Sequence, residues 1–246
     1  MPALKVSGLE FSYGPVPLIR DLSLELRGGD FMCVLGPNGC GKSTLLRLLT
    51  GYARAQGGTV RLGGEEVSSL APGRLARLAA YVPSETATPY DFSVRETVLL
   101  GRTARAGLWR GYSAADGEAA DLALEETGIT ALAHRSINTL STGERQLAFI
   151  AQALAQEAKL LLLDEPTSHL DLRYKSQVMS LLARLAGKGF AVAAVLHEPA
   201  LARLGCNKAL LFSGGSCVFG DAKTLLAPER LAAAYGVPPD SPMLPK

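Results

Sequence analysis

A glycine-rich segment from Gly36 to Ser43 contains residues whose types and spacing suit the binding of phosphate groups. It reads GPNGCGKS and follows the pattern GxxxxGK[ST]. The glycines permit a tight turn in which successive backbone N–H groups point inward, and a following helix adds its positive N-terminal end. Lys42 would contact the β and γ phosphates of a nucleotide, and Ser43 would offer its hydroxyl to Mg²⁺. We therefore predict a nucleotide-binding loop made of Gly36, Pro37, Asn38, Gly39, Cys40, Gly41, Lys42, Ser43 and Thr44.

A second segment, Lys159 to Glu165, ends in two adjacent carboxylates after an apolar run. Its sequence, KLLLLDE, predicts a buried strand with Asp164 and Glu165 at its carboxyl end. One carboxylate is needed to hold a metal ion through its water shell, and an adjacent one can polarise an attacking water. We assign the first role to Asp164 and the second to Glu165. Apolar strands often end in acidic residues, so this pair indicates a catalytic site only because a phosphate loop lies upstream of it.

A third segment, LSTGE at Leu140 to Glu144, admits two interpretations. Ser141 and Glu144 form the S-x-x-E pattern of a capping box, which any helix start can use. The same geometry would leave a capped helix N-terminus with Ser141 and the backbone of Gly143 exposed, which is an anion site. On the second interpretation, Ser141, Gly143 and Glu144 receive a γ-phosphate presented by another subunit.

The elements that must position these segments predict an α/β fold. FMCVL, which ends at Leu35, is a short apolar strand of the kind buried in a parallel sheet, and a helix from Lys42 to Thr50 follows the loop. Apolar runs at Leu160–Leu163 and Ala191–Leu196 end in polar residues, as central parallel strands do where ligands bind. The segment from Leu4 to Arg27 suggests antiparallel strands.

The composition limits the class of protein. With 246 residues, of which 48% are hydrophobic and 20% charged, the chain is long enough for one α/β domain with a grafted lobe. A net charge of +2 is too small to indicate a nucleic-acid partner. Helical periodicity from about residue 93 to residue 156 predicts the lobe. Within it, Arg102, Arg105 and Arg110 lie close together, and we interpret them as a solvated face.

Neither the cysteines nor the apolar segments indicate a secreted or membrane-spanning protein. The cysteines show no CxxC pair and no histidine spacing typical of zinc sites, so we expect reduced thiols at Cys33, Cys40, Cys206 and Cys217. The N-terminal sequence MPALKVSGLE lacks the apolar core of a signal peptide, and no apolar run reaches the roughly 18 residues of a spanning helix. Any membrane association is therefore expected to come through a partner.

Taken together, the phosphate loop, LSTGE and LLLLDEPTSHLD resemble the ABC ATPase family over nearly the whole chain. The resemblance implies a phosphate-loop ATPase core with a mostly parallel sheet, an N-terminal antiparallel β subdomain and an inserted helical subdomain at about residues 85–156. It implies one ATPase domain over residues 1–237, followed by a proline-rich tail at 238–246. It further implies a head-to-tail homodimer around two ATP molecules with Mg²⁺, in which each ATP lies between one subunit's phosphate loop and the other's LSTGE segment.

Three further positions take their expected roles from the resemblance. His197, at the end of AVAAVL, matches a histidine that contacts the γ-phosphate, so the expected catalytic residues are Glu165, His197 and Lys42. Tyr13 matches an aromatic ring that stacks on adenine, although core packing is the ordinary interpretation of an isolated tyrosine. Ser84 stands where the family has a glutamine that contacts Mg²⁺, which leaves Ser43, Asp164 and a water-bridged Ser84 as the expected metal contacts.

Within the family, VRETVLLGR and FGDAKTLLAPERLAAAYGV resemble ATPases of importers for iron-siderophore, haem or cobalamin. Such a subunit is implied to lie on the cytoplasmic face of the inner membrane, bound to permease subunits and indirectly to a solute-binding receptor. Two alternatives stay open: a molybdate or tungstate importer, and a weakly hydrolysing ATP-binding module. The chain lacks the long heptad segment of chromosome-organising relatives, and it has one cassette where translation factors usually have two.

Overall fold

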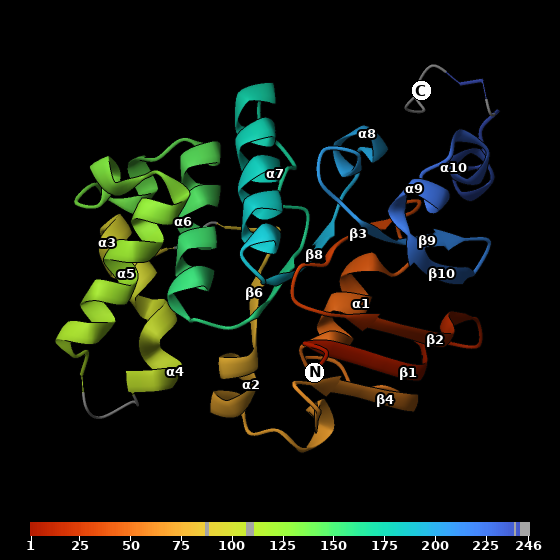
Figure 1. Ribbon diagram of the computed structural model, residues 1–246, viewed down its shortest axis with the longest axis horizontal. Helices are drawn as coiled ribbons and strands as arrows, with labels where there is room; N and C mark the ends of the chain where they lie inside the picture. The colour runs from red at the N-terminus through yellow and green to blue at the C-terminus, as the bar shows by residue number, and fades with distance from the viewer. Residues whose placement is uncertain (87–88, 107–110, 239, 242–246) are drawn as a thin grey trace.

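A six-stranded sheet carries the phosphate loop and the carboxylates. The computed structural model describes residues 1–86, 89–106, 111–238 and 240–241. The strand order in this sheet is β10-β9-β3-β8-β7-β6 (Figure 1). Its strands are β3 (Phe31–Leu35), β6 (Ala79–Val82), β7 (Leu160–Leu163), β8 (Ala191–Val195), β9 (Lys208–Ser213) and β10 (Ser216–Asp221). The pairs from β6 to β9 are parallel, and β10 is antiparallel to β9. The predicted parallel core is therefore confirmed.

The N-terminal residues form a second, antiparallel sheet in the order β2-β1-β4-β5. Its strands are β1 (Leu4–Ser12), β2 (Pro17–Leu26), β4 (Gly57–Leu62) and β5 (Glu65–Glu66). In β1, Leu4 and Val6 are buried while Lys5 and Ser7 are exposed, which is the period-two pattern of a strand with one face on the core. The antiparallel strands expected between Leu4 and Arg27 are confirmed.

The six-stranded sheet is covered on both faces, which explains why its central strands are continuously apolar. In β3, Met32 and Val34 join a core with the N-terminal sheet and α1 (Lys42–Leu49). Phe31, Cys33 and Leu35 point to the other core, which includes α7 (Leu172–Gly187). The phosphate loop, which follows β3, therefore begins at the junction of these two cores.

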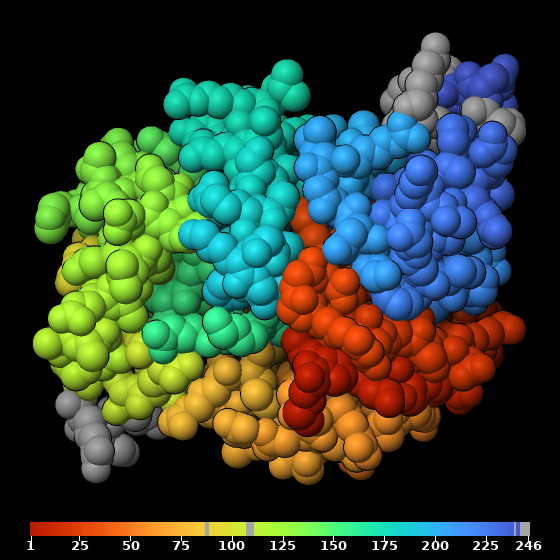
Figure 2. All heavy atoms as spheres, viewed as in Figure 1, coloured from red at the N-terminus to blue at the C-terminus, as the bar shows by residue number. Residues whose placement is uncertain are grey.

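A helical lobe stands beside the sheet. It comprises α3 (Val94–Leu99), η2 (Leu100–Arg102), α4 (Thr103–Ala106), α5 (Ala114–Thr127), η3 (Thr130–Leu132), η4 (Ile137–Thr139) and α6 (Thr142–Ala155). Figure 2 shows the lobe in green at one side of this face and the N-terminal strands in red toward the other. The mixed α/β architecture with an antiparallel N-terminal sheet and a helical insertion agrees with the predicted fold class.

The remaining helices lie outside the lobe: η1 (Val67–Ser69), α2 (Pro72–Leu78), α8 (Pro199–Ala202), α9 (Ala222–Leu225) and α10 (Pro228–Tyr235). None of the helices among the described residues has the length and apolar character needed to cross a membrane. Most of the proline-rich tail predicted at residues 238–246 lies outside the described residues.

Candidate functional site

The phosphate loop has the backbone that its glycines predict. Gly36, Gly39 and Gly41 have φ angles of 146°, 76° and 107°, a region that side-chain-bearing residues rarely adopt. Gly36 is also tightly packed, because a Cβ there would lie 2.7 Å from the Cβ of Phe212. At Gly39, by contrast, a Cβ would meet nothing within 4 Å. The loop is therefore fixed at its start and open at its rim.

Lys42 lies inside this loop, although it carries a charge. Its side chain is buried, and Nζ donates hydrogen bonds to the carbonyl oxygens of Gly36 at 2.8 Å and Pro37 at 2.9 Å. The hydroxyl of Tyr235 in α10 accepts a hydrogen bond from the N–H of Gly36 at 3.1 Å. No local pattern predicts this last contact, because it joins the loop to a residue nearly 200 positions later.

The first carboxylate, Asp164, meets the phosphate loop directly. Ser43 Oγ donates to Asp164 Oδ1 at 3.0 Å, and Tyr81 Oη donates to Asp164 Oδ2 at 3.2 Å. Asp164 is 3% exposed, and burial raises the pKa of its carboxyl. Burial, with the neighbouring Asp164, also raises the pKa of Tyr81 to about 12. The predicted pair of Ser43 and Asp164 is in contact, and Tyr81 is a neighbour that sequence reasoning missed.

The second carboxylate, Glu165, contacts the predicted histidine. His197 Nε2 lies 2.7 Å from Glu165 Oε1, and Ser168 Oγ donates to Glu165 Oε2 at 3.2 Å. Glu165 has a φ of 53°, an uncommon left-handed conformation for a residue with a side chain. Such strained positions cluster at functional sites, where the surrounding structure determines the backbone. Ser168, which follows β7, and His197, which follows β8, therefore hold the carboxylate.

The residues present fit a nucleoside triphosphate with Mg²⁺. The open side at Gly39 leaves room for phosphate oxygens beside the loop N–H groups. Ser43 and Asp164 supply the hard oxygen ligands that Mg²⁺ prefers. Within the described part of the chain, no group of three or more His, Cys, Asp or Glu could hold a metal ion. Mg²⁺ does not need one, since substrate phosphates and waters complete its octahedron.

Tyr13 lies at the edge of the phosphate loop. Its hydroxyl is 3.3 Å from Thr44 Oγ1, and its ring packs edge-on against Phe11 with centroids 4.8 Å apart. The residue is 70% exposed, so the ring does not belong to the core. A ring held at its tip and edge, with much of its surface exposed, can stack on a planar base.

The LSTGE segment folds as a capping box at the start of α6. Glu144 N–H donates to Ser141 Oγ at 3.3 Å, and Ser141 N–H donates to Glu144 Oε2 at 2.8 Å. Ser141 is exposed and lowers the pKa of Glu144 through its backbone N–H. The capping box is therefore present, and the Glu144 carboxylate is engaged within it.

The expectation that the Gly143 backbone is exposed is wrong. Gly143 is buried, and a Cβ there would lie 2.2 Å from the Tyr174 ring. The first turn of α7, which begins after its N-cap Asp171, places this ring over the glycine. Only Ser141 and Thr142 are left exposed at this helix start. The segment also lies apart from the phosphate loop, because α7 separates α6 from α1 in Figure 1.

Ser84 follows β6 in an exposed bend. Its position after Val82 places it near the end of the strand that pairs with β7, whose last residue precedes Asp164. The structure brings the phosphate loop, Asp164, Glu165 and His197 together. Ser84 is not among the residues joined by these contacts.

A cavity of about 640 Å³ lies between the lobe and the sheet, which we call the lobe cavity. It is lined by residues of α2, the end of β6, the segment Leu100–Ala104 and one side of α6. Gln156, just after α6, lines the cavity and donates through Nε2 to the carbonyl oxygens of Ala76 and Ala79, the latter at 2.9 Å. The cavity therefore joins the lobe to the strand that leads to the site.

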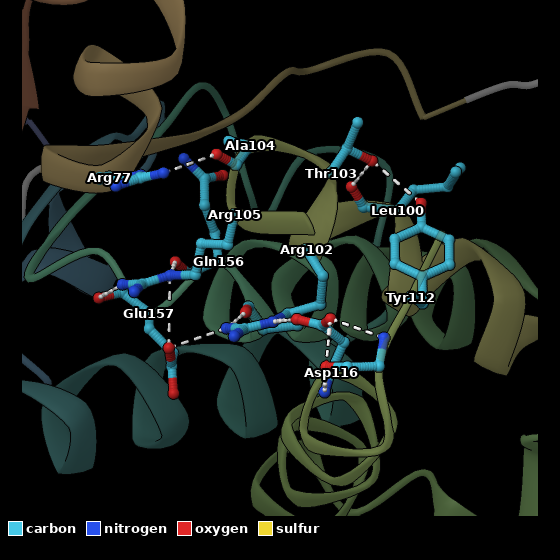
Figure 3. Close-up of polar contacts among 12 residues, drawn as sticks. Arg77, Leu100, Arg102, Thr103, Ala104, Arg105, Tyr112, Asp116, Gln156 and Glu157 are labelled. Carbon is cyan, nitrogen blue, oxygen red and sulfur yellow. Dashed lines mark hydrogen bonds and ion pairs between the residues drawn. The ribbon is translucent and has the colours of Figure 1, made fainter. Parts of the chain in front are cut away.

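An ion-pair cluster, in which Arg102 and Asp116 are buried and Glu157 is exposed, lies on the lobe side of this cavity. Figure 3 shows the Arg102 guanidinium between Asp116 and Glu157. Arg102 Nε donates to Asp116 Oδ1 at 2.9 Å, and Nη1 donates to the carbonyl oxygen of Ala155 at 2.7 Å. Hydrogen bonds from Ser113, and then from Arg102, lower the pKa of Asp116 to about 2. The 3₁₀ turn at Arg102 is thus tied to the C-terminal end of α6.

This cluster corrects the expectation of a solvated arginine face. Arg102 is only 7% exposed, because its guanidinium is enclosed by two carboxylates and a helix C-terminus. Arg105 is exposed as expected. Arg110 lies outside the described residues.

Comparisons with known proteins agree with this geometry. A family model described as ABC transporter matches residues 19–168. The ferric enterobactin transport ATP-binding protein FepC of Escherichia coli is 38% identical over 95% of this chain and 87% of its own length. The uncharacterized ABC transporter ATP-binding protein YvrA of Bacillus subtilis is 39% identical over 87% of this chain, which spans only 49% of that relative. A solved structure described as a metal-chelate type ABC transporter in an inward-facing conformation has a TM-score of 0.86 at 36% identity, covering 97% of this chain and 90% of that one.

Proposed function

This chain belongs to the ABC transporter family of ATP-binding proteins, and on that premise we propose that it is the ATP-hydrolysing subunit of an importer. One observation carries the proposal: the phosphate loop meets the carboxylate of Asp164, next to the carboxylate that meets His197. Ser43 Oγ lies 3.0 Å from Asp164 Oδ1, and the adjacent Glu165 contacts His197 at 2.7 Å. Groups for the phosphates, the metal ion and the attacking water therefore converge on one edge of the sheet.

Binding of ATP uses the loop and the residues at its rim. The N–H groups from Gly36 to Thr44 receive the phosphates, and Lys42 exchanges its two loop carbonyls for phosphate oxygens. The exposed ring of Tyr13 stacks on the adenine. Ser43 and Asp164 hold Mg²⁺, with Ser84 contributing through a bridging water. Mg²⁺, when bound, neutralises charge on the β and γ phosphates.

Hydrolysis uses the second carboxylate. Glu165 orients the attacking water and accepts its proton, and Ser168 and His197 hold the carboxylate in place. His197 also contacts the γ-phosphate, since its imidazole lies beside the group that polarises the water. Lys42 and the loop N–H groups stabilise the charge that develops on the transferred group.

The active form is a head-to-tail homodimer around two ATP molecules. The argument is geometric: Ser141 is exposed at a capped helix N-terminus, yet α7 separates this helix from the phosphate loop of the same chain. A second copy can bring its own Ser141 to the γ-phosphate, where the helix N-terminus favours negative charge. Closure of the dimer then completes the site. The ATPase domain in this proposal spans residues 1–237, with the helical subdomain at about 85–156.

Permease subunits bind at the lobe cavity, and the chain thereby lies on the cytoplasmic face of the membrane as a peripheral subunit. The cavity is concave and about 640 Å³ in volume, and the Arg102 cluster secures one of its walls, so it suits a protruding element of a membrane partner. A solute-binding receptor is contacted only through that permease. The transported solute is a metal chelate, such as an iron-siderophore, haem or cobalamin; the similarity to FepC over 95% of this chain and to a metal-chelate type transporter over 97% of it supports this assignment.

Two measurements test this proposal. Purified protein with ATP and Mg²⁺ should release phosphate, and Glu165→Gln should stop the release while ATP binding persists. Wild-type protein that binds ATP without hydrolysing it would favour the alternative of a regulatory ATP-binding module. Proteoliposomes with the co-purified permease and receptor should then accumulate a ferric chelate. Uptake of molybdate alone would replace the metal-chelate assignment with an oxyanion one.

A further inference from the structure

Tyr81 connects the carboxylate of Asp164 with the lobe cavity, which have separate roles in the proposed function. It is the third residue of β6, and its hydroxyl donates to Asp164 Oδ2 at 3.2 Å. Its ring lies 6.1 Å, centroid to centroid, from the ring of Tyr52. The same residue lines the lobe cavity and a second cavity of about 800 Å³ beside α1 and β4, which we call the sheet cavity. One half-buried tyrosine thus donates its hydroxyl to the site carboxylate and lies at the wall of both cavities.

The contact with Asp164 fixes the orientation of the carboxylate. Oδ1 accepts from Ser43 at 3.0 Å and Oδ2 accepts from Tyr81 at 3.2 Å, so a donor from a different element holds each oxygen. Asp164 is 3% exposed, so bulk water cannot readily replace either donor. Residues that donate hydrogen bonds to a metal-binding carboxylate orient it, and their mutation commonly lowers the affinity for the metal.

We infer that Tyr81 is a positioning residue: it orients Asp164 for Mg²⁺ and links whatever fills the lobe cavity to that carboxylate. The inference rests on the proposed binding of ATP with Mg²⁺. A group that enters the lobe cavity beside Tyr81 can displace its ring. The hydroxyl moves with the ring, because the side chain is rigid beyond Cβ. The orientation of Asp164 then depends on the occupancy of the cavity.

Ser84 cannot provide this link in the same way. It lies three residues further along in an exposed bend, and in the proposed function it acts on the metal only through a bridging water. Tyr81 makes a direct hydrogen bond to Asp164. The direct link in this chain therefore lies within β6 and not in the bend after it.

The first test removes only the hydroxyl. In Tyr81→Phe, the dissociation constant for Mg²⁺ in the presence of a non-hydrolysable ATP analogue should rise about tenfold. Affinity for the analogue in EDTA should stay at the wild-type value, and turnover should recover at saturating Mg²⁺. Calorimetry measures the first two quantities, and Mn²⁺ electron paramagnetic resonance gives an independent readout of the metal. Tyr52→Phe is the matched control, because it removes the hydroxyl of the neighbouring ring, whereas the side chains that donate to Asp164 are those of Ser43 and Tyr81.

Equal Mg²⁺ affinity in Tyr81→Phe and Tyr52→Phe would overturn the positioning role. Failure of the wild-type protein to bind the analogue at all would instead contradict the proposed function. The two failures are distinguishable because the wild-type measurement with EDTA does not involve Tyr81.

The second test addresses the link to the cavity. Ala76 lines both cavities, so Ala76→Phe places a ring beside Tyr81 without touching the site. We expect this substitution to change the Mg²⁺ dissociation constant in the wild-type background, and to change it by a smaller factor when combined with Tyr81→Phe. A double-mutant cycle measures the difference. Equal effects in both backgrounds, including no effect in either, would show that the cavity does not act through the tyrosine hydroxyl.

Discussion

Nε2 of His197 lies 2.7 Å from Oε1 of Glu165. Polar residues that follow β8 and β7 therefore meet at the edge of the sheet. Parallel strands make this meeting possible, since adjacent carboxyl ends point the same way. Ser168 holds the other oxygen of Glu165 at 3.2 Å. The carboxylate is therefore oriented before any substrate arrives, which is what a group that activates a water needs.

Glu165→Gln should trap an ATP-bound dimer. The amide cannot accept a proton from water, so turnover should fall by about 10² to 10⁴ while the binding contacts remain. Sedimentation with ATP and Mg²⁺ should detect the dimer, and the same protein with ADP provides the control. A variant that stays monomeric with ATP would contradict the proposed assembly.

Lys42→Ala should abolish turnover and leave the fold intact. The Lys42 ammonium donates to the loop carbonyl oxygens of Gly36 and Pro37, so its removal takes away a phosphate contact and no core packing. Calorimetry should register a loss of ATP affinity, while circular dichroism should match the wild type. Arg47→Ala, on the exposed face of the same helix, is the matched control. Unchanged ATP affinity in Lys42→Ala would refute the assignment of the loop.

Gly143→Ala should destabilise the start of α6. The new Cβ would lie 2.2 Å from the Tyr174 ring, so either the ring or the helix must shift. Overpacking of this kind costs about 1 to 3 kcal/mol of unfolding free energy, measurable by urea denaturation. The cost should shrink in a Tyr174→Leu background, which removes the ring. An equal cost in both backgrounds would mean that the glycine is needed for another reason.

Ser141→Arg should block turnover without weakening ATP binding to the monomer. The arginine adds bulk at the exposed helix start, and the proposed target of Ser141 belongs to the other subunit. Titration of monomeric protein with a fluorescent ATP analogue measures binding, and phosphate release measures turnover. Thr142→Arg tests whether bulk one residue later has the same effect. Loss of ATP binding by the Ser141→Arg monomer would point to a disturbed fold.

Asp116→Asn should make stability less dependent on acidity below about pH 4. The folded-state pKa of Asp116 is about 2, below the ordinary value of 3.8. Between these values the unfolded chain binds more protons, so the stabilisation from this carboxylate is complete above about pH 4 and is lost as the pH falls toward 2. Urea midpoints at about pH 5.5 and about pH 3 should differ less in the variant than in the wild type.

Asp121→Asn is the control for that experiment. It removes a carboxylate that pairs with Arg95 on the surface, where water screens the pair. We expect a smaller change in the acid dependence than for Asp116→Asn. If the two variants behave alike, the buried pair with Arg102 contributes no more than a surface pair.

Much of the site could be predicted because its signals are local. GPNGCGKS specifies positive φ angles at Gly36, Gly39 and Gly41, and the structure has them. Ser141 and Glu144 are three residues apart, the spacing at which a capping box closes, and both of its hydrogen bonds form. FMCVL and LLLL are apolar throughout because both faces of their sheet are covered. In each case the physical cause acts within a few residues of the pattern.

Burial and long-range contact depended on the tertiary structure. The sequence predicts an exposed turn at Gly143, but Tyr174 of α7 packs over it. The sequence likewise predicts a surface charge at Arg102, but Asp116 and Glu157 enclose it. The hydrogen bonds from Tyr81 to Asp164 and from Gly36 to Tyr235 join segments far apart in the chain. A residue's type and its neighbours in sequence determine which backbone conformation it can adopt. Its contact partners depend instead on which elements pack against it. Those elements are brought together only when distant strands and helices assemble into the tertiary structure.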